Sequence, residues 1–232
     1  MAFNSVAAPC PPCPSAYDVH TLTQVWQGLN AQSCPATYNF HMHTCCSDGQ
    51  LTPEALMEQA LQIGLKGMAI TDHHSVQGYQ RAARWLSEQF PYPQKPHLWT
   101  GIEITSALNG VNVHILGYGF EPRQGAIARY LTGKSPKGAA AQAATVIQAI
   151  QQAGGLAVLA HPARYRRPYA ELIPAAAAIG INGIETYYAY RREKPWQPTP
   201  EITPGVEALV AELGLLRTCG TDTHGLNLRL RI

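Results

Sequence analysis

The sequence predicts an α/β fold that closes, or nearly closes, into a barrel. Three observations support this prediction: short apolar runs alternate with helical patterns, six or seven such runs occur, and polar residues follow most of them. A barrel of eight units usually has roughly 250 residues, so a chain of 232 residues suits a slightly smaller one. A doubly wound open sheet is the alternative fold.

The composition is that of one globular domain with a substantial core. Of all residues, 46% are hydrophobic and only 14% are charged, and 17 basic against 15 acidic residues give a net charge of +2. These values exclude a disordered chain or a polyelectrolyte as the main identity. They also give no support for binding long nucleic acid through bulk electrostatics, so any phosphate must be bound locally.

The first 36 residues are expected to extend the main domain. Residues 1–16 are rich in proline and are predicted to be disordered. Residues 17–36 are predicted to form a helical arm, and residues 37–232 form the main domain. The arm has apolar residues at the spacing of one helix face, namely Leu22, Val25, Trp26 and Leu29.

Strands and helices alternate along the main domain. The predicted strands are residues 38–43, 67–73, 98–106, 111–120, 156–161, 181–188 and 215–220. The predicted helices are residues 52–64, 77–89, 138–153, 174–178 and 206–213. Thr52 and Pro53 supply an N-cap and a first helical residue. Asn109-Gly110 is a turn signal that predicts a hairpin between the third and fourth strands.

The sequence predicts a cytoplasmic protein. No stretch reaches the roughly 20 apolar residues of a membrane span, and no basic segment followed by an apolar one begins the chain. The six cysteines are therefore expected to be reduced thiols rather than a disulfide framework. Cys10 and Cys13 are discounted as a metal site, because they lie among prolines and no second Cys-x-x-Cys motif accompanies them.

Most of the nine histidines lie at or near the end of a predicted strand. In the first strand His41 and His43 point to one side and Phe40 and Met42 to the other, because side chains alternate along a strand. The carboxyl ends of the strands of a parallel barrel converge on one face, so we expect the polar residues there to meet. The later members of this set are Asp72, His73, His74, Glu103, His114, His161, Glu185, Asp222 and His224.

A single histidine in an apolar strand is more often a hydrogen-bonded core residue than a metal ligand. The whole set is different, because burying so many imidazoles and carboxylates together would leave donors and charges uncompensated. Divalent cations remove this conflict, since neutral imidazoles and ionised carboxylates are their natural ligands. The sequence therefore predicts a site for divalent metal ions, with Zn, Mn or Fe as candidates.

Seven motifs occur in the order His41-Met42-His43, Ser47-Asp48-Gly49, Ile70-Thr71-Asp72-His73, Gly101-Ile102-Glu103, His114-Ile115-Leu116-Gly117, Ala160-His161-Pro162 and Gly220-Thr221-Asp222-Thr223-His224-Gly225. Together they resemble the PHP family, the polymerase and histidinol phosphatase domain. The match covers about residues 37 to 226. The resemblance implies a distorted, TIM-like barrel of seven βα units with three metal ions at its mouth, and a metal-dependent phosphoesterase activity.

The resemblance also implies the ligands. One metal would be held by His41, His43, Glu103 and Asp222, with Glu103 bridging to a second metal held by His114 and His161. A third would be held by Asp48, His73 and His224. Two roles stay open for Glu185, a carboxylate that fixes an imidazole or a packing residue. His74 stands where the commoner family pattern has an aspartate, and a ligand, a proton donor and a solvent-exposed residue are all open for it.

The expected reaction is hydrolysis of a small phosphomonoester or a nucleotide phosphate by a metal-bridging hydroxide. Arg164 and Arg167 follow His161 in the loop at the barrel mouth, so they are predicted to bind the substrate phosphate, with a solvated loop as the alternative. Two other functions stay open: an exonuclease that trims short oligonucleotides, and a non-catalytic metal-binding module. The short stretch from Glu121 to Gly138 counts against nucleotide specificity, because nucleotide-acting members of the family often carry a long insertion there.

Overall fold

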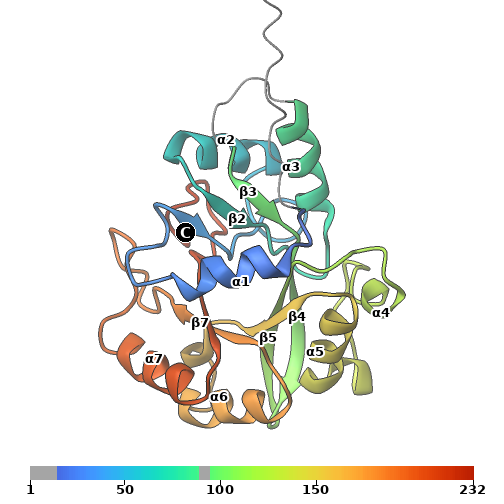
Figure 1. Cartoon of the computed structure of the whole chain (residues 1–232), viewed down its shortest axis with the longest axis vertical. Coiled ribbons are helices and arrows are strands. Elements are labelled where there is room, and N and C mark those ends of the chain that lie inside the picture. The colour runs from blue at the N-terminus through green and yellow to red at the C-terminus, as the bar shows by residue number, and fades with distance from the viewer. Residues whose placement is uncertain (1–14, 89–94) are drawn as a thin grey trace, which may run out of the picture.

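The computed structural model describes residues 15–88 and 95–232. Its strands form two sheets (Figure 1). The smaller sheet is parallel and contains β1 (Tyr38–Asn39), β2 (Gly67–Ala69) and β3 (His97–Trp99). The larger sheet contains, in spatial order, β4 (Gly101–Leu108), β5 (Val111–Tyr118), β6 (Leu156–Leu159), β7 (Gly183–Tyr187) and β8 (Leu216–Cys219). Cys10, Cys13 and the predicted disordered segment up to residue 14 lie outside the described residues.

Single β-bridges join the two sheets at two places, one after β1 and one after β2. Met42 pairs with Thr223, and His73 pairs with Glu103. The strands therefore come close to a ring, but the described residues form two sheets rather than one closed barrel. The expected α/β fold is confirmed, and the expected barrel is only approached. The first two strands are shorter than predicted, because beyond β1 and β2 the chain is held by these bridges and by side-chain hydrogen bonds.

The predicted hairpin is present as β4 and β5. Asn109 and Gly110 both have positive φ, 50° and 78°, which is the backbone of the two-residue turn that joins twisted strands most easily. β5 runs antiparallel to β4 and also to β6, whereas β6, β7 and β8 are parallel to one another. The larger sheet is therefore mixed, unlike the all-parallel sheet of a regular barrel.

Helices α2 and α3 accompany the small sheet, and α5, α6 and α7 accompany the large one (Figure 1). The α-helices are α1 (Val19–Gln27), α2 (Pro53–Ile63), α3 (Gln77–Glu88), α4 (Gly125–Ala128), α5 (Ala143–Gln152), α6 (Tyr169–Ala178) and α7 (Thr203–Glu212). Among the described residues, none of the helices combines the length and the apolar character that a membrane crossing requires.

Two helices differ most from their predicted extent. α6 starts at Tyr169 and continues through Pro174, because Leu172, Ile173 and Ala176 bury one face of it in the core. The helix predicted from residue 138 is divided into a short 3-10 turn and α5, because Gln142 between them has an extended backbone. The short helix α4 was not predicted.

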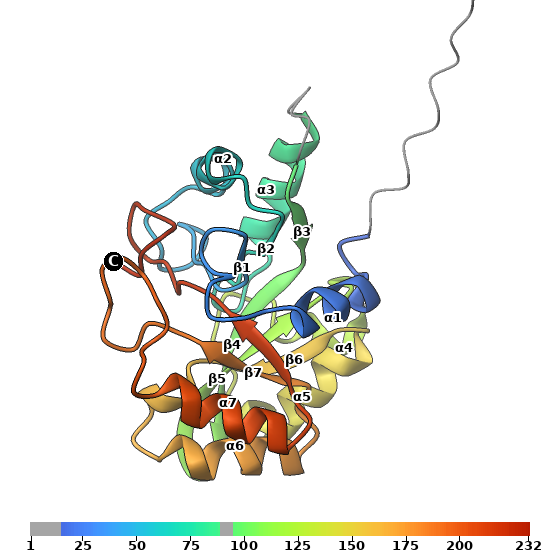
Figure 2. The same ribbon diagram turned by 60° about the vertical axis from the view of Figure 1, so that its left-hand side comes forward.

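The arm helix α1 is part of the core (Figure 2). Its Leu22 and Trp26 are buried in a cluster that takes one or more apolar residues from β2, β3, β5, β6, β7 and β8, and Phe40 from the segment after β1. On most of the parallel strands these residues precede the polar ones, as Phe40 precedes His41, although Tyr187 follows Glu185 on β7. On the antiparallel β5 the order is reversed, and Tyr118 follows His114. The apolar cluster therefore lies mainly toward the ends of the strands opposite to those that carry the polar side chains.

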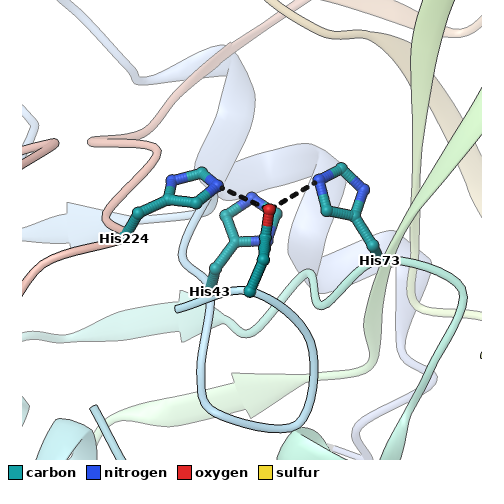
Figure 3. Close-up of side chains that lie close together, drawn as sticks. His43, His73 and His224 are labelled. Carbon is teal, nitrogen blue, oxygen red and sulfur yellow. Dashed lines mark ion pairs between the residues drawn. The ribbon is translucent and has the colours of Figure 1, made fainter. Parts of the chain in front are cut away.

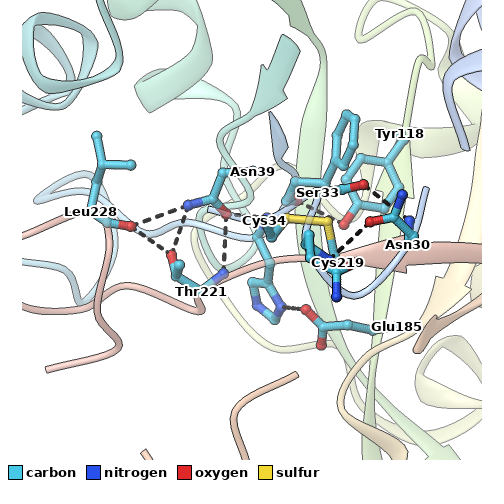
Figure 4. The surroundings of a disulfide bond; sticks show 12 residues. Asn30, Ser33, Cys34, Asn39, Tyr118, Glu185, Cys219, Thr221 and Leu228 are labelled. Carbon is cyan, nitrogen blue, oxygen red and sulfur yellow. Dashed lines mark hydrogen bonds and ion pairs between the residues drawn. A yellow bond between two sulfur atoms is a disulfide. The ribbon is translucent and has the colours of Figure 1, made fainter. Parts of the chain in front are cut away.

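A disulfide fastens the arm to the last strand. Cys34 and Cys219 are bonded, and both are buried beside β1 (Figure 4). This corrects the expectation that all cysteines are thiols: the two residues are distant in sequence, and only the packing of the arm against β8 brings them together. Cys45 and Cys46 are free, as expected. A cytoplasmic location stays a prediction from the sequence.

Candidate metal centre

Most of the polar side chains come from segments that follow the strands, whereas Glu103, His114 and Glu185 lie within strands β4, β5 and β7. His74, His161 and Asp222 have φ values of 53°, 28° and 53°, a left-handed backbone that is uncommon outside glycine and is often found at functional sites. Gly220 lies shortly before Asp222. A Cβ atom there would collide with the backbone and Cβ of His41, so only glycine lets β8 approach the first motif this closely.

The first group of donors surrounds one oxygen of Glu103. The Nε2 atoms of His41 and His43 lie 3.1 Å and 2.9 Å from Glu103 Oε2, and 3.4 Å and 3.3 Å from Asp222 Oδ1. All four side chains are buried. Their donor atoms lie within 4.8 Å of one another, close enough to share one cation.

The other oxygen of Glu103 faces a different pair of imidazoles. His114 Nδ1 lies 2.7 Å and His161 Nε2 lies 3.4 Å from Glu103 Oε1. His73 also approaches, with its Nε2 atom 3.7 Å from Oε2, and it forms a possible ligand group with Glu103 and His114. Glu103 therefore stands between two groups of nitrogen donors, one on each carboxylate oxygen.

A third group gathers around Asp48 (Figure 3). Asp48 Oδ2 lies 3.3 Å from His224 Nε2 and 3.6 Å from His73 Nε2, and Oδ1 lies 3.5 Å from His43 Nδ1. Figure 3 shows His224 and His73 pointing at this carboxylate from opposite sides, with His43 behind it. The structure thus brings together all nine residues that the resemblance assigned as ligands.

Hydrogen bonds on the far side of two imidazoles orient them. His41 Nδ1 donates to Glu185 Oε1 at 2.8 Å, which leaves Nε2 facing the first group. His224 Nδ1 donates to the carbonyl oxygen of Asp222 at 2.8 Å, which leaves Nε2 facing Asp48. Such partners are characteristic of metal-binding histidines, because they fix both the ring and its protonation. Of the two roles left open for Glu185, the structure favours the carboxylate that fixes an imidazole.

The charges of the site depend on one another. Burial alone would lower the pKa of His41, but the carboxylates of Glu185, Glu103 and Asp222 raise it well above its usual value. Burial would also lower the pKa of His43, yet hydrogen bonds to Asp222 and Glu103 raise it to about 9. Burial alone would raise the pKa of Glu103, and the facing imidazoles, His41 foremost, hold it well below its usual value. The buried carboxylates therefore require positive charge beside them.

Several buried ring nitrogens have no hydrogen bond. No hydrogen-bond partner is found for either ring nitrogen of His43 and His161, or for Nδ1 of His114. Oε1 of Glu103 likewise accepts no hydrogen bond. These atoms nevertheless lie at short distances from one another. Buried polar atoms almost always have partners, so donors that converge without bonding one another fit a site that holds cations.

Arg164, Arg167 and His74, for which the sequence predicts roles outside the nine ligands, lie in different surroundings. Arg164 reaches the centre, where its Nη1 atom donates to Asp222 Oδ2 at 2.8 Å. Arg167 instead pairs with Glu171 on α6, at 2.6 Å. His74 is buried, and its Nε2 atom lies 3.2 Å from Thr105 Oγ1 and 3.1 Å from Ser135 Oγ. It is therefore not exposed to solvent, and its part as a proton donor stays a prediction.

Two residues of the centre were missed by the sequence analysis. Tyr188 and Arg231 both donate to Asp222 Oδ2, the hydroxyl from 2.7 Å and the Nε atom from 2.8 Å. Tyr188 is the last residue of the predicted strand 181–188, and nothing in its immediate neighbours marks it as polar site chemistry. The only sequence signal for Arg231 was its position in a basic stretch shortly after His224.

A sequence model of the PHP domain matches residues 39–197, more than half of the chain. The chain belongs to the PHP domain family. The motif resemblance is thereby confirmed. Asp222 and His224 lie beyond the matched segment, although the structure places both in the centre.

Characterised PHP relatives are named as hydrolases of phosphate esters. The 5'-3' exoribonuclease Rnm of Escherichia coli is 35% identical over 80 residues, which are 34% of this chain and 26% of that protein. A phosphoribosyl 1,2-cyclic phosphate 1,2-diphosphodiesterase of Eggerthella lenta is 37% identical over 92 residues, 39% of this chain and 33% of that protein. A 3',5'-nucleoside bisphosphate phosphatase of Chromobacterium violaceum is 29% identical over 123 residues, which are 53% of this chain and 40% of that protein. The matched part spans less than half of each relative.

Solved structures share the fold over nearly the whole chain. A candidate metal-dependent phosphoesterase from Bifidobacterium adolescentis superposes with a TM-score of 0.67 at 24% identity, covering 83% of this chain and 90% of that one. An amidohydrolase from Chromobacterium violaceum gives a TM-score of 0.69 at 20% identity, covering 85% of this chain and 90% of that one. The PHP fold is therefore common to this chain and these proteins.

Proposed function

We propose that the protein is a metal-dependent phosphoesterase that hydrolyses a small phosphomonoester or a nucleotide phosphate. The observation that carries the proposal is the position of Glu103, whose two oxygens face His41 and His43 on one side and His114 and His161 on the other. A carboxylate between two groups of nitrogen donors suits a pair of cations. The named relatives, which act on phosphate esters, support the same reaction class.

The nine side chains would hold two or three divalent ions. The first group is His41, His43, Glu103 and Asp222, the second is Glu103, His114 and His161, and the third is Asp48, His73 and His224. Bound cations of this kind acidify a water molecule and neutralise charge on phosphoryl oxygens. Imidazole and carboxylate ligands accept Zn, Mn or Fe, so availability decides among them.

Residues around the nine side chains hold some of them in their orientation. Glu185 holds the His41 ring, and Tyr188 holds Asp222 with its other oxygen toward the imidazoles. Arg164 lies at the edge of the centre and lines a cavity of about 430 Å³ with residues 110–112, Tyr165 and Arg166. Small-molecule sites have roughly 300–1,000 Å³, so the cavity has the volume of such a site.

A second candidate is an exonuclease that trims short oligonucleotides. The relationship to 5'-3' exoribonucleases favours it. The net charge of +2 disfavours extended binding along long nucleic acid. Comparing a mononucleotide with oligonucleotides of increasing length as substrates separates the two candidates: an exonuclease releases nucleotides one at a time from an oligonucleotide end.

The test combines elemental analysis with a substrate panel. We expect purified protein to contain divalent metal, and metal-loaded protein to hydrolyse phosphomonoesters or nucleotides. Glu103→Gln should lose both metal and activity, whereas Glu212→Gln, an exposed carboxylate of α7, should keep both. Metal-loaded protein that turns over no phosphomonoester and no phosphodiester would contradict the proposal and favour a non-catalytic metal-binding module.

A further inference from the structure

The C-terminal segment, the residues after His224, folds back onto the metal centre. Leu228 is fully buried, and its carbonyl oxygen accepts hydrogen bonds from Asn39 Nδ2 (3.2 Å) and Thr221 Oγ1 (2.9 Å), as Figure 4 shows. The main-chain N–H of His224 donates to the carbonyl oxygen of Arg231 at 2.7 Å. These bonds fix the path of the segment and bring the Arg231 side chain to the centre.

Arg231 and Arg164 meet at one carboxylate oxygen, although they come from different parts of the chain. Arg231 Nε and Arg164 Nη1 each lie 2.8 Å from Asp222 Oδ2, the oxygen that also accepts from Tyr188. The Arg231 side chain is 15% exposed and that of Arg164 is 36% exposed, so a ligand can reach both from solvent. Asp222 Oδ1 is turned the other way, toward the imidazoles of the first group.

The charges at this point do not balance. Two guanidinium groups, which are always charged, share the single negative charge of Asp222. Within residues 15–88 and 95–232 neither arginine forms an ion pair with another acidic residue. Cations in the metal centre would add further positive charge beside them. The pair therefore leaves an excess of positive charge that an anion would offset.

The geometry of the guanidinium group suits a phosphate as that anion. An arginine side chain has five N–H donors in one plane, and Asp222 takes the single Nε–H of Arg231. The two Nη groups form the part of the fork that binds phosphate oxygens in pairs. A lysine at this position would offer only a point charge.

We propose that Arg231 and Arg164 form an arginine pair that binds the phosphoryl group of the substrate beside the metal centre. The inference rests on the phosphoesterase function proposed above and narrows its substrate class. A terminal phosphate carries a charge of about −1.5 to −2 at neutral pH, whereas an internal diester carries a single charge. The arginine pair therefore favours terminal phosphomonoesters over internal phosphodiesters, and the C-terminal segment supplies part of the substrate site.

Steady-state kinetics with one monoester and one diester test this preference. Metal-loaded wild type, Arg231→Ala, Arg231→Lys and Arg229→Ala are compared on p-nitrophenyl phosphate and bis(p-nitrophenyl) phosphate. We expect Arg231→Ala to raise the KM for the monoester about ten- to a hundred-fold and that for the diester less. Arg231→Lys should recover part of the loss. Arg229 is exposed in the same segment, so Arg229→Ala should behave as wild type.

Calorimetric titration with inorganic phosphate and measurement of metal content complete the test. Weaker phosphate binding by Arg231→Ala at wild-type metal content supports the arginine pair. Unchanged phosphate affinity and KM would overturn it, as would a loss of metal in proportion to the loss of activity, because Arg231 would then only hold Asp222. Wild-type protein that hydrolyses neither ester, but binds phosphate through Arg231, would refute the phosphoesterase function and leave the arginine pair standing.

Discussion

Glu185 fixes the ring of His41 through a hydrogen bond of 2.8 Å between Oε1 and Nδ1. The second oxygen of the same carboxylate accepts the main-chain N–H of His161, also at 2.8 Å. Glu185 is fully buried and lies on β7, so one side chain holds both the His41 ring, after β1, and the main chain of His161, after β6. Its contribution to metal binding can be measured separately from the ligands.

Glu185→Gln should weaken metal binding by about ten- to a hundred-fold, because an amide holds His41 with less charge and basicity. Competition with a chromophoric chelator measures the affinity. The matched control is Glu171→Gln on α6, an exposed carboxylate whose partner is Arg167. Equal affinities of the Glu185 and Glu171 variants would show that the hydrogen bond to His41 has no part in binding.

Removing metal should lower the melting temperature of the protein. A cation that binds only the folded state at a hundred times its Kd stabilises it by about 2.7 kcal/mol. Thermal unfolding after treatment with a chelator, and again after adding Mn or Zn, measures the shift. Glu103→Gln should lose most of the recovery, since Glu103 contacts both groups of imidazoles. The same recovery in this variant would place the metal elsewhere.

Arg164 and Arg167 should differ in their effect on catalysis. Arg164→Ala removes a guanidinium from Asp222, so KM for a phosphomonoester should rise. Arg167→Ala should leave KM unchanged and alter the free energy of unfolding by less than about 1 kcal/mol, because Arg167 forms an exposed pair with Glu171. A large KM effect in Arg167→Ala would instead support the phosphate-binding role that the sequence predicts for it.

Breaking the bond between Cys34 and Cys219 should destabilise the fold. The bond closes a loop of 185 residues, and the chain-entropy argument gives a loss of up to about 5 kcal/mol when it is removed. Denaturant unfolding of Cys34→Ser measures this loss, and Cys45→Ser is the control because Cys45 is an exposed thiol. Thiol titration of the denatured, unreduced wild type should find at most four reactive cysteines out of the six in the sequence; six would contradict the bond.

Local patterns were sufficient to predict much of the fold. Asn109-Gly110 marked the β4–β5 hairpin, and Thr52 with Pro53 marked the start of α2, since each signal acts within a few residues. The residues that gather in the metal centre were also visible, because His41 and His43 alternate with apolar neighbours and similar polar residues end later strands. Periodicity did not show where pairing stops, so β1 and β2 were predicted too long.

What the sequence did not show depends on contacts between distant segments. The disulfide needs the arm and β8 side by side, and no spacing of cysteines reveals that. Arg231 reaches the centre because hydrogen bonds hold Leu228 in place. One comes from Asn39, far away along the chain, and one from Thr221, in the last polar motif. Arg167 looked equivalent to Arg164, but the short turn after His161 directs the two side chains differently.

The bond between the main-chain N–H of Asp222 and the carbonyl oxygen of His41, 2.8 Å long, makes the beginning and the end of the domain neighbours. A recombinant fragment trimmed to residues 39–197 would lack β8, Asp222 and His224. The group around Asp48 would then lose His224, and the first group would lose Asp222. The smallest piece worth expressing must therefore extend past residue 224. For the same reason, new termini for a permuted gene belong in surface turns, away from the junction between β1 and β8.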